Sequence, residues 1–297
     1  MTASGAQAFR DIFFSSEDGL RLHARDYPAA TSGVKAQLPV ICLPGLSRNA
    51  RDFHQLALML AHAPAAPRRV VAVDYRGRGL SQYDPSPANY NVMTECRDVI
   101  ALCDTLGLKR CLFIGTSRGG LILHVMAALR PDLITATVLN DIGPEIEAQG
   151  LMEIRDYLGR RAIYSSFEEA ANGLAAVHGA TFPALDPIDW LDMAHALYTE
   201  RAGALVPDYD PALNDQLYAI DFSKPLPTLW PQFESLAEKP MLVIRGEHSK
   251  LFSEQTLQAM MENRANVTAQ TARGHGHAPL LHHRDVFPSL SAFLPRF

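Results

Sequence analysis

The stretch CLFIGTSRGG, residues 111–120, joins an apolar run of strand-forming residues to a helix-forming run through a glycine-rich turn. Ser117 lies on this turn between Gly115 and Gly119, in the pattern G-x-S-x-G of a nucleophile elbow. Glycine is expected at both flanking positions because so tight a turn leaves no room for a Cβ atom. We therefore predict a strand, a sharp turn and a buried helix, with Ser117 exposed as a nucleophile.

Apolar runs on both sides of this stretch predict a sheet that is covered by helices on both faces. An Asp-Gly pair at residues 18–19 predicts an antiparallel hairpin at one edge. The fold class is predicted to be α/β, a doubly wound, mostly parallel, eight-stranded sheet. The expected strands cover residues 11–15, 20–27, 39–43, 69–74, 111–115, 134–139, 240–246 and 266–271, and the expected helices cover 52–62, 94–106, 121–129, 252–263 and 285–293.

The alternation of strand and helix stops after the sixth strand. Helical segments separated by proline-rich links follow instead, at residues 151–158, 167–177 and 190–198. We predict a core domain from residues 1–144 and 239–297, and a helical cap insertion at residues 145–238. The substrate pocket is expected between sheet and cap, with candidate lining residues Leu151, Met152, Trp190, Met193 and Trp230.

Composition excludes several functional classes. The 297 residues carry a net charge of −5 without a long basic run, which argues against a nucleic-acid partner. No apolar run approaches the roughly 18 residues of a membrane span, so no membrane partner is expected. Residues 1–14 lack signal-peptide features and cysteine use is modest, which predicts a cytoplasmic protein. A small-molecule substrate is the expected partner, and the sequence does not predict the oligomeric state.

A serine nucleophile needs a general base, and His277 is the candidate. It lies in the segment GHGHAPL, residues 274–280, directly after the last predicted strand, at the sheet edge where such folds bind ligands. His275 competes for the role. We prefer His277 because Ala278 and Pro279 restrict the backbone that follows it.

Two backbone N–H groups are expected to form an oxyanion hole. One belongs to Arg118, the residue after the nucleophile. The other is assigned to Leu46, in the loop after the third strand. The Arg118 side chain is expected to reach either a substrate anion or a carboxylate of the cap.

With these motifs in this order, the chain resembles the α/β-hydrolase superfamily over nearly its whole length. The resemblance is carried by PGL at 44–46, DYRGRGLS at 74–81, GTSRG at 115–119 and GHAP at 276–279. It implies a cap between the sixth and seventh strands of the sheet and no cofactor. No cysteine and histidine pattern suggests a metal.

The third member of a catalytic triad departs from this resemblance. Relatives usually carry an aspartate a few residues past the glycine in the loop after the seventh strand, where this chain has Lys250. Asp141, just past the sixth strand, is the preferred acid, Glu247 is the alternative, and a site without an acid is the third possibility. A lysine 4 Å from a protonated His277 would oppose it by roughly 4 kcal/mol. Lys250 is therefore expected to point away or to pair with a carboxylate.

The preferred function is a serine hydrolase that cleaves a small carboxylic ester through an acyl-enzyme. One alternative is a hydrolase of a carbon–carbon bond beside a ketone, which cap-bearing relatives catalyse. Another is a non-catalytic ligand-binding protein with a degenerate triad, for which Lys250 is the supporting feature. Serine at position 117 disfavours dehalogenase and epoxide-hydrolase chemistry, since those relatives use aspartate there.

Overall fold

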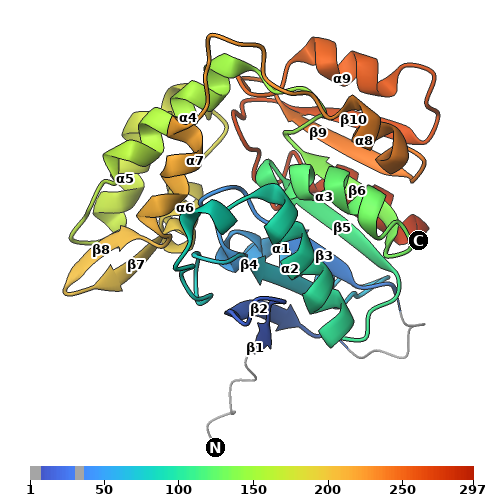
Figure 1. Ribbon diagram of the computed structural model, residues 1–297, viewed down its shortest axis with the longest axis horizontal. Helices are drawn as coiled ribbons and strands as arrows, with labels where there is room; N and C mark the ends of the chain where they lie inside the picture. The colour runs from blue at the N-terminus through green and yellow to red at the C-terminus, as the bar shows by residue number, and fades with distance from the viewer. Residues whose placement is uncertain (1–7, 31–36) are drawn as a thin grey trace, which may run out of the picture.

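The computed structural model describes residues 8–30 and 37–297, so residues 1–7 of the segment used for the signal-peptide prediction lie outside it. In the described part of the chain, eight strands form a sheet in the order β1-β2-β4-β3-β5-β6-β9-β10 (Figure 1). Only the pairs β1–β2 and β2–β4 are antiparallel, so the predicted sheet is confirmed. The strands are β1 (Arg10–Ser15), β2 (Arg21–Tyr27), β3 (Val40–Leu43), β4 (Val70–Asp74), β5 (Cys111–Thr116), β6 (Ile134–Asn140), β9 (Met241–Gly246) and β10 (Val267–Ala272).

Helices cover both faces of the sheet, because alternate residues of each buried strand point to opposite sides. Ile41 and Leu43 pack on one face with α2, α3, α8 and α9, whereas Val40 and Cys42 pack on the other with α1 and α10. These helices are α1 (His54–Ala61), α2 (Val92–Thr105), α3 (Arg118–Leu129), α8 (Trp230–Leu236), α9 (Glu254–Met261) and α10 (Phe287–Phe293).

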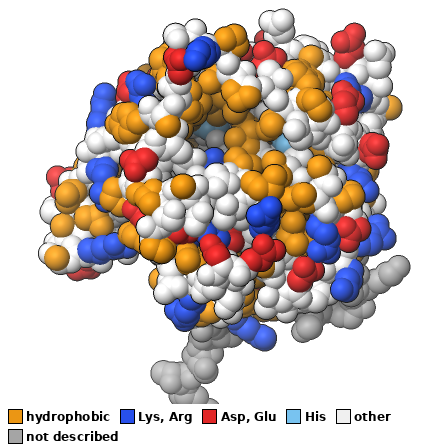
Figure 2. Space-filling model, viewed as in Figure 1, with side chains coloured by type: hydrophobic (Ala, Val, Ile, Leu, Met, Phe, Trp, Pro, Cys, Tyr) orange, Lys and Arg blue, Asp and Glu red, His pale blue; other side chains and the backbone are white. Residues whose placement is uncertain are grey.

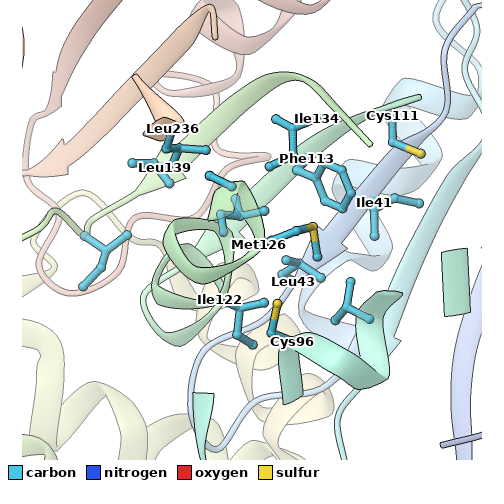
Figure 3. Close-up of a cluster of buried hydrophobic side chains, with 14 of the residues drawn as sticks. Ile41, Leu43, Cys96, Cys111, Phe113, Ile122, Met126, Ile134, Leu139 and Leu236 are labelled. Carbon is cyan, nitrogen blue, oxygen red and sulfur yellow. The ribbon is translucent and has the colours of Figure 1, made fainter. Parts of the chain in front are cut away.

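The core on the first face is centred on α3. Figure 3 shows Ile122 and Met126 of this helix beside Leu43 and Phe113 of the central strands. Leu236 of α8 belongs to the same buried cluster, although α8 lies inside the segment predicted as cap. The rigid packing around α3 holds the turn that precedes this helix.

The segment between β6 and β9 stands beside one end of the sheet (Figure 1). It contains α4 (Ala148–Arg160), α5 (Phe167–His178), α6 (Pro187–Leu197) and α7 (Asp215–Tyr218), and it has a hydrophobic cluster of its own around Leu174, Trp190 and Leu205. The three helices expected from the sequence are present. The division into core and cap at residues 145 and 238 stays a prediction.

A two-stranded hairpin in this segment was not predicted. Strands β7 (Tyr198–Arg201) and β8 (Ala204–Pro207) pair in antiparallel fashion, so the insertion is not purely helical. The turn between them places Ala202 at φ 52° and Gly203 at φ 79°. Alanine rarely adopts this conformation, and the Ala-Gly pair is therefore a weak turn signal.

None of the helices in the described ranges is both long and apolar enough to cross a lipid bilayer.

Burial of His124 predicts that the fold weakens in mild acid. Its Nδ1–H donates to the Gly120 carbonyl at 2.7 Å, and burial lowers the pKa of His124 to about 4. The unfolded chain takes up this proton as the pH falls below about 6.5, whereas the folded chain does not. The unfolded state thus binds more protons between these two pH values. The free energy of unfolding therefore decreases as the pH is lowered from about 6.5 to about 4, by up to roughly 3 kcal/mol from this group.

Thermal melts at pH 7.5 and pH 5 should measure this effect. The melting temperature is expected to drop at pH 5 in the wild type, and to drop less in His124→Gln, which has no titrating imidazole. An identical pH dependence in both proteins would contradict the assignment to His124.

Candidate active site

Ser117 occupies the turn between β5 and α3, as the spacing predicts. Its backbone has φ 50° and ψ −112°, which residues other than glycine rarely adopt. A Cβ at Gly115 would lie 2.7 Å from the carbonyl carbon of Gly119, and a Cβ at Gly119 would overlap the Leu43 carbonyl oxygen. The turn therefore requires glycine at both positions, and it presents the Ser117 hydroxyl at the carboxyl end of the sheet.

His277 comes from the loop after β10 and meets Ser117 at this edge. Its Nε2 lies 2.9 Å from Ser117 Oγ, and its Nδ1 lies 2.7 Å from Asp141 Oδ2. When the Asp141 carboxylate accepts from Nδ1–H, Nε2 is free to accept from the Ser117 hydroxyl. The hydrogen bonds thus select the tautomer in which His277 is a base toward Ser117.

Asp141 is buried at the end of β6, and two contacts with β9 hold it there. Its backbone N–H donates to the Ile244 carbonyl at 2.7 Å, and its Oδ1 accepts from the Gly246 N–H at 2.7 Å. The second carboxylate oxygen is therefore directed at His277. The structure brings together Ser117, His277 and Asp141; their catalytic roles remain a prediction.

The competing candidates lie outside this chain of hydrogen bonds. Glu247 Oε2 accepts from the Gly274 N–H at 2.8 Å, so this carboxylate supports the loop before His277 and does not contact its ring. His275 is buried, with Nδ1 2.9 Å from the Arg273 carbonyl.

Lys250 points away from His277 and pairs with a carboxylate. Its Nζ lies 2.8 Å from Glu153 Oε1 of α4, and both side chains are about half exposed. The lysine at the family's usual acid position therefore bridges the β9 loop to the inserted segment. It does not oppose a charge on His277, and the argument for a degenerate site loses its support.

The geometry around Ser117 is compatible with the predicted oxyanion donors. Arg118 is the first residue of α3, so its N–H has no intrahelical acceptor. The Gly45 carbonyl accepts from Arg48 N–H at 3.1 Å, and a trans peptide directs the Leu46 N–H the opposite way. A Cβ at Gly45 would lie 3.9 Å from Ser117 Cβ, which places this loop beside the nucleophile.

The Arg118 side chain pairs with a carboxylate of the core domain, so the expected salt bridge to the cap is wrong. Its Nε lies 2.6 Å from Glu95 Oε2 of α2, in the interior of the core. Sequence spacing carries no sign of this pairing, because 23 residues separate the two positions.

A cavity of about 240 Å³ opens at Ser117 and His277. A hollow rimmed by hydrophobic side chains, with histidine visible inside, is seen on the face in Figure 2. Of the five lining residues proposed from the sequence, only Met193 lines the cavity. Leu151, Trp190 and Trp230 pack into hydrophobic clusters instead. The apolar lining includes Leu46, Ile154, Leu158, Leu174, Leu197 and Leu280.

Two ion pairs lie in the cavity wall, of which the one at Arg48 was not predicted. Arg48 and Asp52 pair through two contacts of 2.6 Å, and Lys250 and Glu153 form the second pair. Each of these cations is therefore matched by an anion. Within residues 8–30 and 37–297, no cluster of three or more His, Cys, Asp or Glu side chains is arranged to hold a metal ion.

Asn140 is a further residue that the sequence analysis missed. Its amide nitrogen donates to Thr116 Oγ1 at 3.1 Å and to the Pro279 carbonyl at 3.0 Å. It thereby ties the strand before the nucleophile to the loop that carries His277. A polar residue at the carboxyl end of a buried parallel strand was the available signal.

Comparison with known proteins gives consistent results. The family model described as "Alpha/beta hydrolase family" matches residues 40–288. The 3-hydroxybutyrate-oligomer hydrolase of Cupriavidus necator is 30% identical over 266 residues, which is 87% of each chain. The 2-(acetamidomethylene)succinate hydrolase of Mesorhizobium japonicum is 28% identical over 236 residues, 78% of this chain and 79% of the relative. A solved α/β hydrolase from Novosphingobium aromaticivorans is 38% identical, with a TM-score of 0.89 over 99% of this chain and 100% of that one.

Proposed function

The chain belongs to the alpha/beta hydrolase family and is a hydrolase, and we propose that it cleaves a small carboxylic ester by serine catalysis. The observation that carries the proposal is the continuous chain of hydrogen bonds from Ser117 through His277 to Asp141. Each link has the length that a serine triad needs, and the three groups follow one another in the order of such a triad.

In the proposed mechanism, His277 Nε2 takes the hydroxyl proton of Ser117 while Oγ attacks the ester carbonyl carbon. The carbonyl π electrons move to the oxygen, and the N–H groups of Leu46 and Arg118 stabilise this oxyanion. The imidazolium, stabilised by Asp141, then protonates the leaving alkoxide as the ester C–O bond breaks. Water attacks the acyl-enzyme in the same way, with His277 again taking and returning one proton, and the carboxylic acid leaves.

The size and lining of the cavity favour a substrate with a short acyl group. The cavity is small and has many aliphatic side chains in its lining, and the charges of Arg48 and Lys250 in its wall are already paired. The relative from Cupriavidus necator is named for hydrolysis of 3-hydroxybutyrate oligomers. Short esters of hydroxycarboxylic acids, including dimers and trimers, are therefore the first substrates to test.

Covalent labelling tests the proposal directly. A fluorophosphonate probe should label the wild type and leave Ser117→Ala unlabelled, since the probe is attacked by an activated serine. The wild type should also hydrolyse p-nitrophenyl butyrate and a 3-hydroxybutyrate dimer. Labelling without turnover of any ester would overturn the ester assignment and favour cleavage of a carbon–carbon bond, and absence of labelling would overturn serine catalysis.

A further inference from the structure

Two arginines in the interior share a single carboxylate. Glu95 of α2 contacts Arg78 Nη1 through Oε1 at 2.8 Å and Arg118 Nε through Oε2 at 2.6 Å, and the side chains are 0%, 0% and 10% exposed respectively. Burial raises the pKa of Glu95, but the charges of Arg118 and Arg78 outweigh it and the net shift is downward. Glu95 is therefore ionised and holds both guanidinium groups in place.

Each arginine is also connected to one of the two proposed oxyanion donors. Arg78 Nε donates to the Leu46 carbonyl at 2.8 Å. Arg118 itself supplies the other donor, and its Nη2 also donates to the Tyr90 carbonyl at 3.2 Å. The loop after β3 and the start of α3 are thus joined through the carboxylate of Glu95.

The distance between the two donors decides whether an oxyanion hole works. Both N–H groups must lie about 2.7–3.1 Å from the developing oxyanion, and a displacement of about 1 Å can cost on the order of 100-fold in rate. Leu46 belongs to the loop that follows β3, whereas Arg118 is the first residue of α3. A fixed distance between the two N–H groups therefore requires a link from α3 to the loop that contains Leu46.

We propose that Glu95 is a positioning residue of the oxyanion hole, which holds the Leu46 N–H at the correct distance from the Arg118 N–H through the Arg78–Glu95–Arg118 ion pairs. The inference rests on the proposed serine mechanism. Glu95 touches neither substrate nor nucleophile in this account, so its loss should affect the transition state more than substrate binding.

Glu95→Gln is the informative substitution, because it keeps the side-chain shape and places an amide N–H against one arginine donor. The kcat for ester hydrolysis is expected to fall roughly 10- to 100-fold, with KM within about threefold of the wild type. The affinity for a boronic acid that forms a tetrahedral adduct on Ser117 should fall by the same factor as kcat.

Asp98→Asn is the matched control. Asp98 lies one turn further along α2 and forms a buried ion pair with Arg76 at 2.7 Å, so the substitution disturbs a similar buried carboxylate. Arg76 pairs otherwise with Asp18 and Asp84, and among the described residues no ion pair or hydrogen bond joins its side chain to Leu46 or Arg118; only its backbone carbonyl accepts from Arg78 Nη1. Asp98→Asn should lower the melting temperature while kcat, measured well below that temperature, stays within about twofold.

Arg78→Lys tests the same proposal independently, and it can be used if Glu95→Gln does not fold. A lysine keeps the charge but cannot bond Glu95 and the Leu46 carbonyl at once. The kcat of Arg78→Lys should fall by a similar factor. The double variant of Glu95→Gln and Arg78→Lys should lose no more kcat than either single variant, because both substitutions break the same set of ion pairs.

The outcomes separate this inference from the function on which it depends. If Ser117→Ala were as active as the wild type, both would fail. If Ser117→Ala were inactive but the losses in Glu95→Gln and Arg78→Lys equalled that of Asp98→Asn, or appeared only in KM, the positioning role would fail and the serine mechanism would stand.

Discussion

Ser117→Ala is expected to lower the kcat of ester hydrolysis by on the order of 10⁶, and His277→Ala by a similar factor. The first substitution removes the attacking oxygen, and the second removes the only base that the structure places within hydrogen-bond distance of Ser117 among the described residues. Nucleophile and base act as one unit, so the double variant should be no slower than either single variant.

Steady-state assays with p-nitrophenyl butyrate would measure these losses. His62→Ala is a suitable control, because His62 is an exposed histidine at the end of α1 and does not line the cavity. Its kcat should stay within about twofold of the wild type. A His277→Ala variant that kept a tenth of the wild-type kcat would contradict the assignment of the base.

Asp141→Asn is expected to lower kcat by on the order of 10⁴ while leaving KM and the fold largely unchanged. Asparagine can donate to His277 Nδ1, which would favour the tautomer with a proton on Nε2 and leave no acceptor for the Ser117 hydroxyl. An imidazolium formed during the reaction would also lose its neighbouring negative charge. Both effects act on the chemical step.

Glu247→Gln is the matched control for Asp141→Asn, since it is also a carboxylate-to-amide change in a loop at the same edge of the sheet. Glutamine can still accept from the Gly274 N–H, the contact that Glu247 makes. Its kcat is expected to stay within about twofold. If Glu247→Gln lost activity and Asp141→Asn did not, the acid would be assigned to the wrong residue.

The local part of the site was predictable from short stretches of sequence. The turn at Ser117 depends on the absence of side chains at Gly115 and Gly119, and residues 111–120 contain all that is needed to recognise it. His277 was also predictable, since a glycine-flanked histidine after the last strand must lie at the carboxyl edge of a parallel sheet. Both inferences need only local backbone geometry and strand direction.

The proposed acid could not be chosen in the same way. Asp141 and His277 are 136 residues apart, and their contact depends on β6 and β9 lying side by side, with Asn140 opposite Ile244. This pairing carries the Gly246 N–H to one oxygen of Asp141 and leaves the other for His277. The pairing of Lys250 with Glu153 likewise depends on where α4 lies over the β9 loop.

The elbow, the position of His277 and the order of strands and helices thus follow from residue types and their spacing, because backbone sterics and burial act over a few neighbouring positions. Packing of distant segments decides the contact of Asp141 with His277, the Arg78–Glu95–Arg118 ion pairs and the residues that line the cavity. Side-chain contacts of this kind depend on distances in space, and spacing along the chain contains no measure of them.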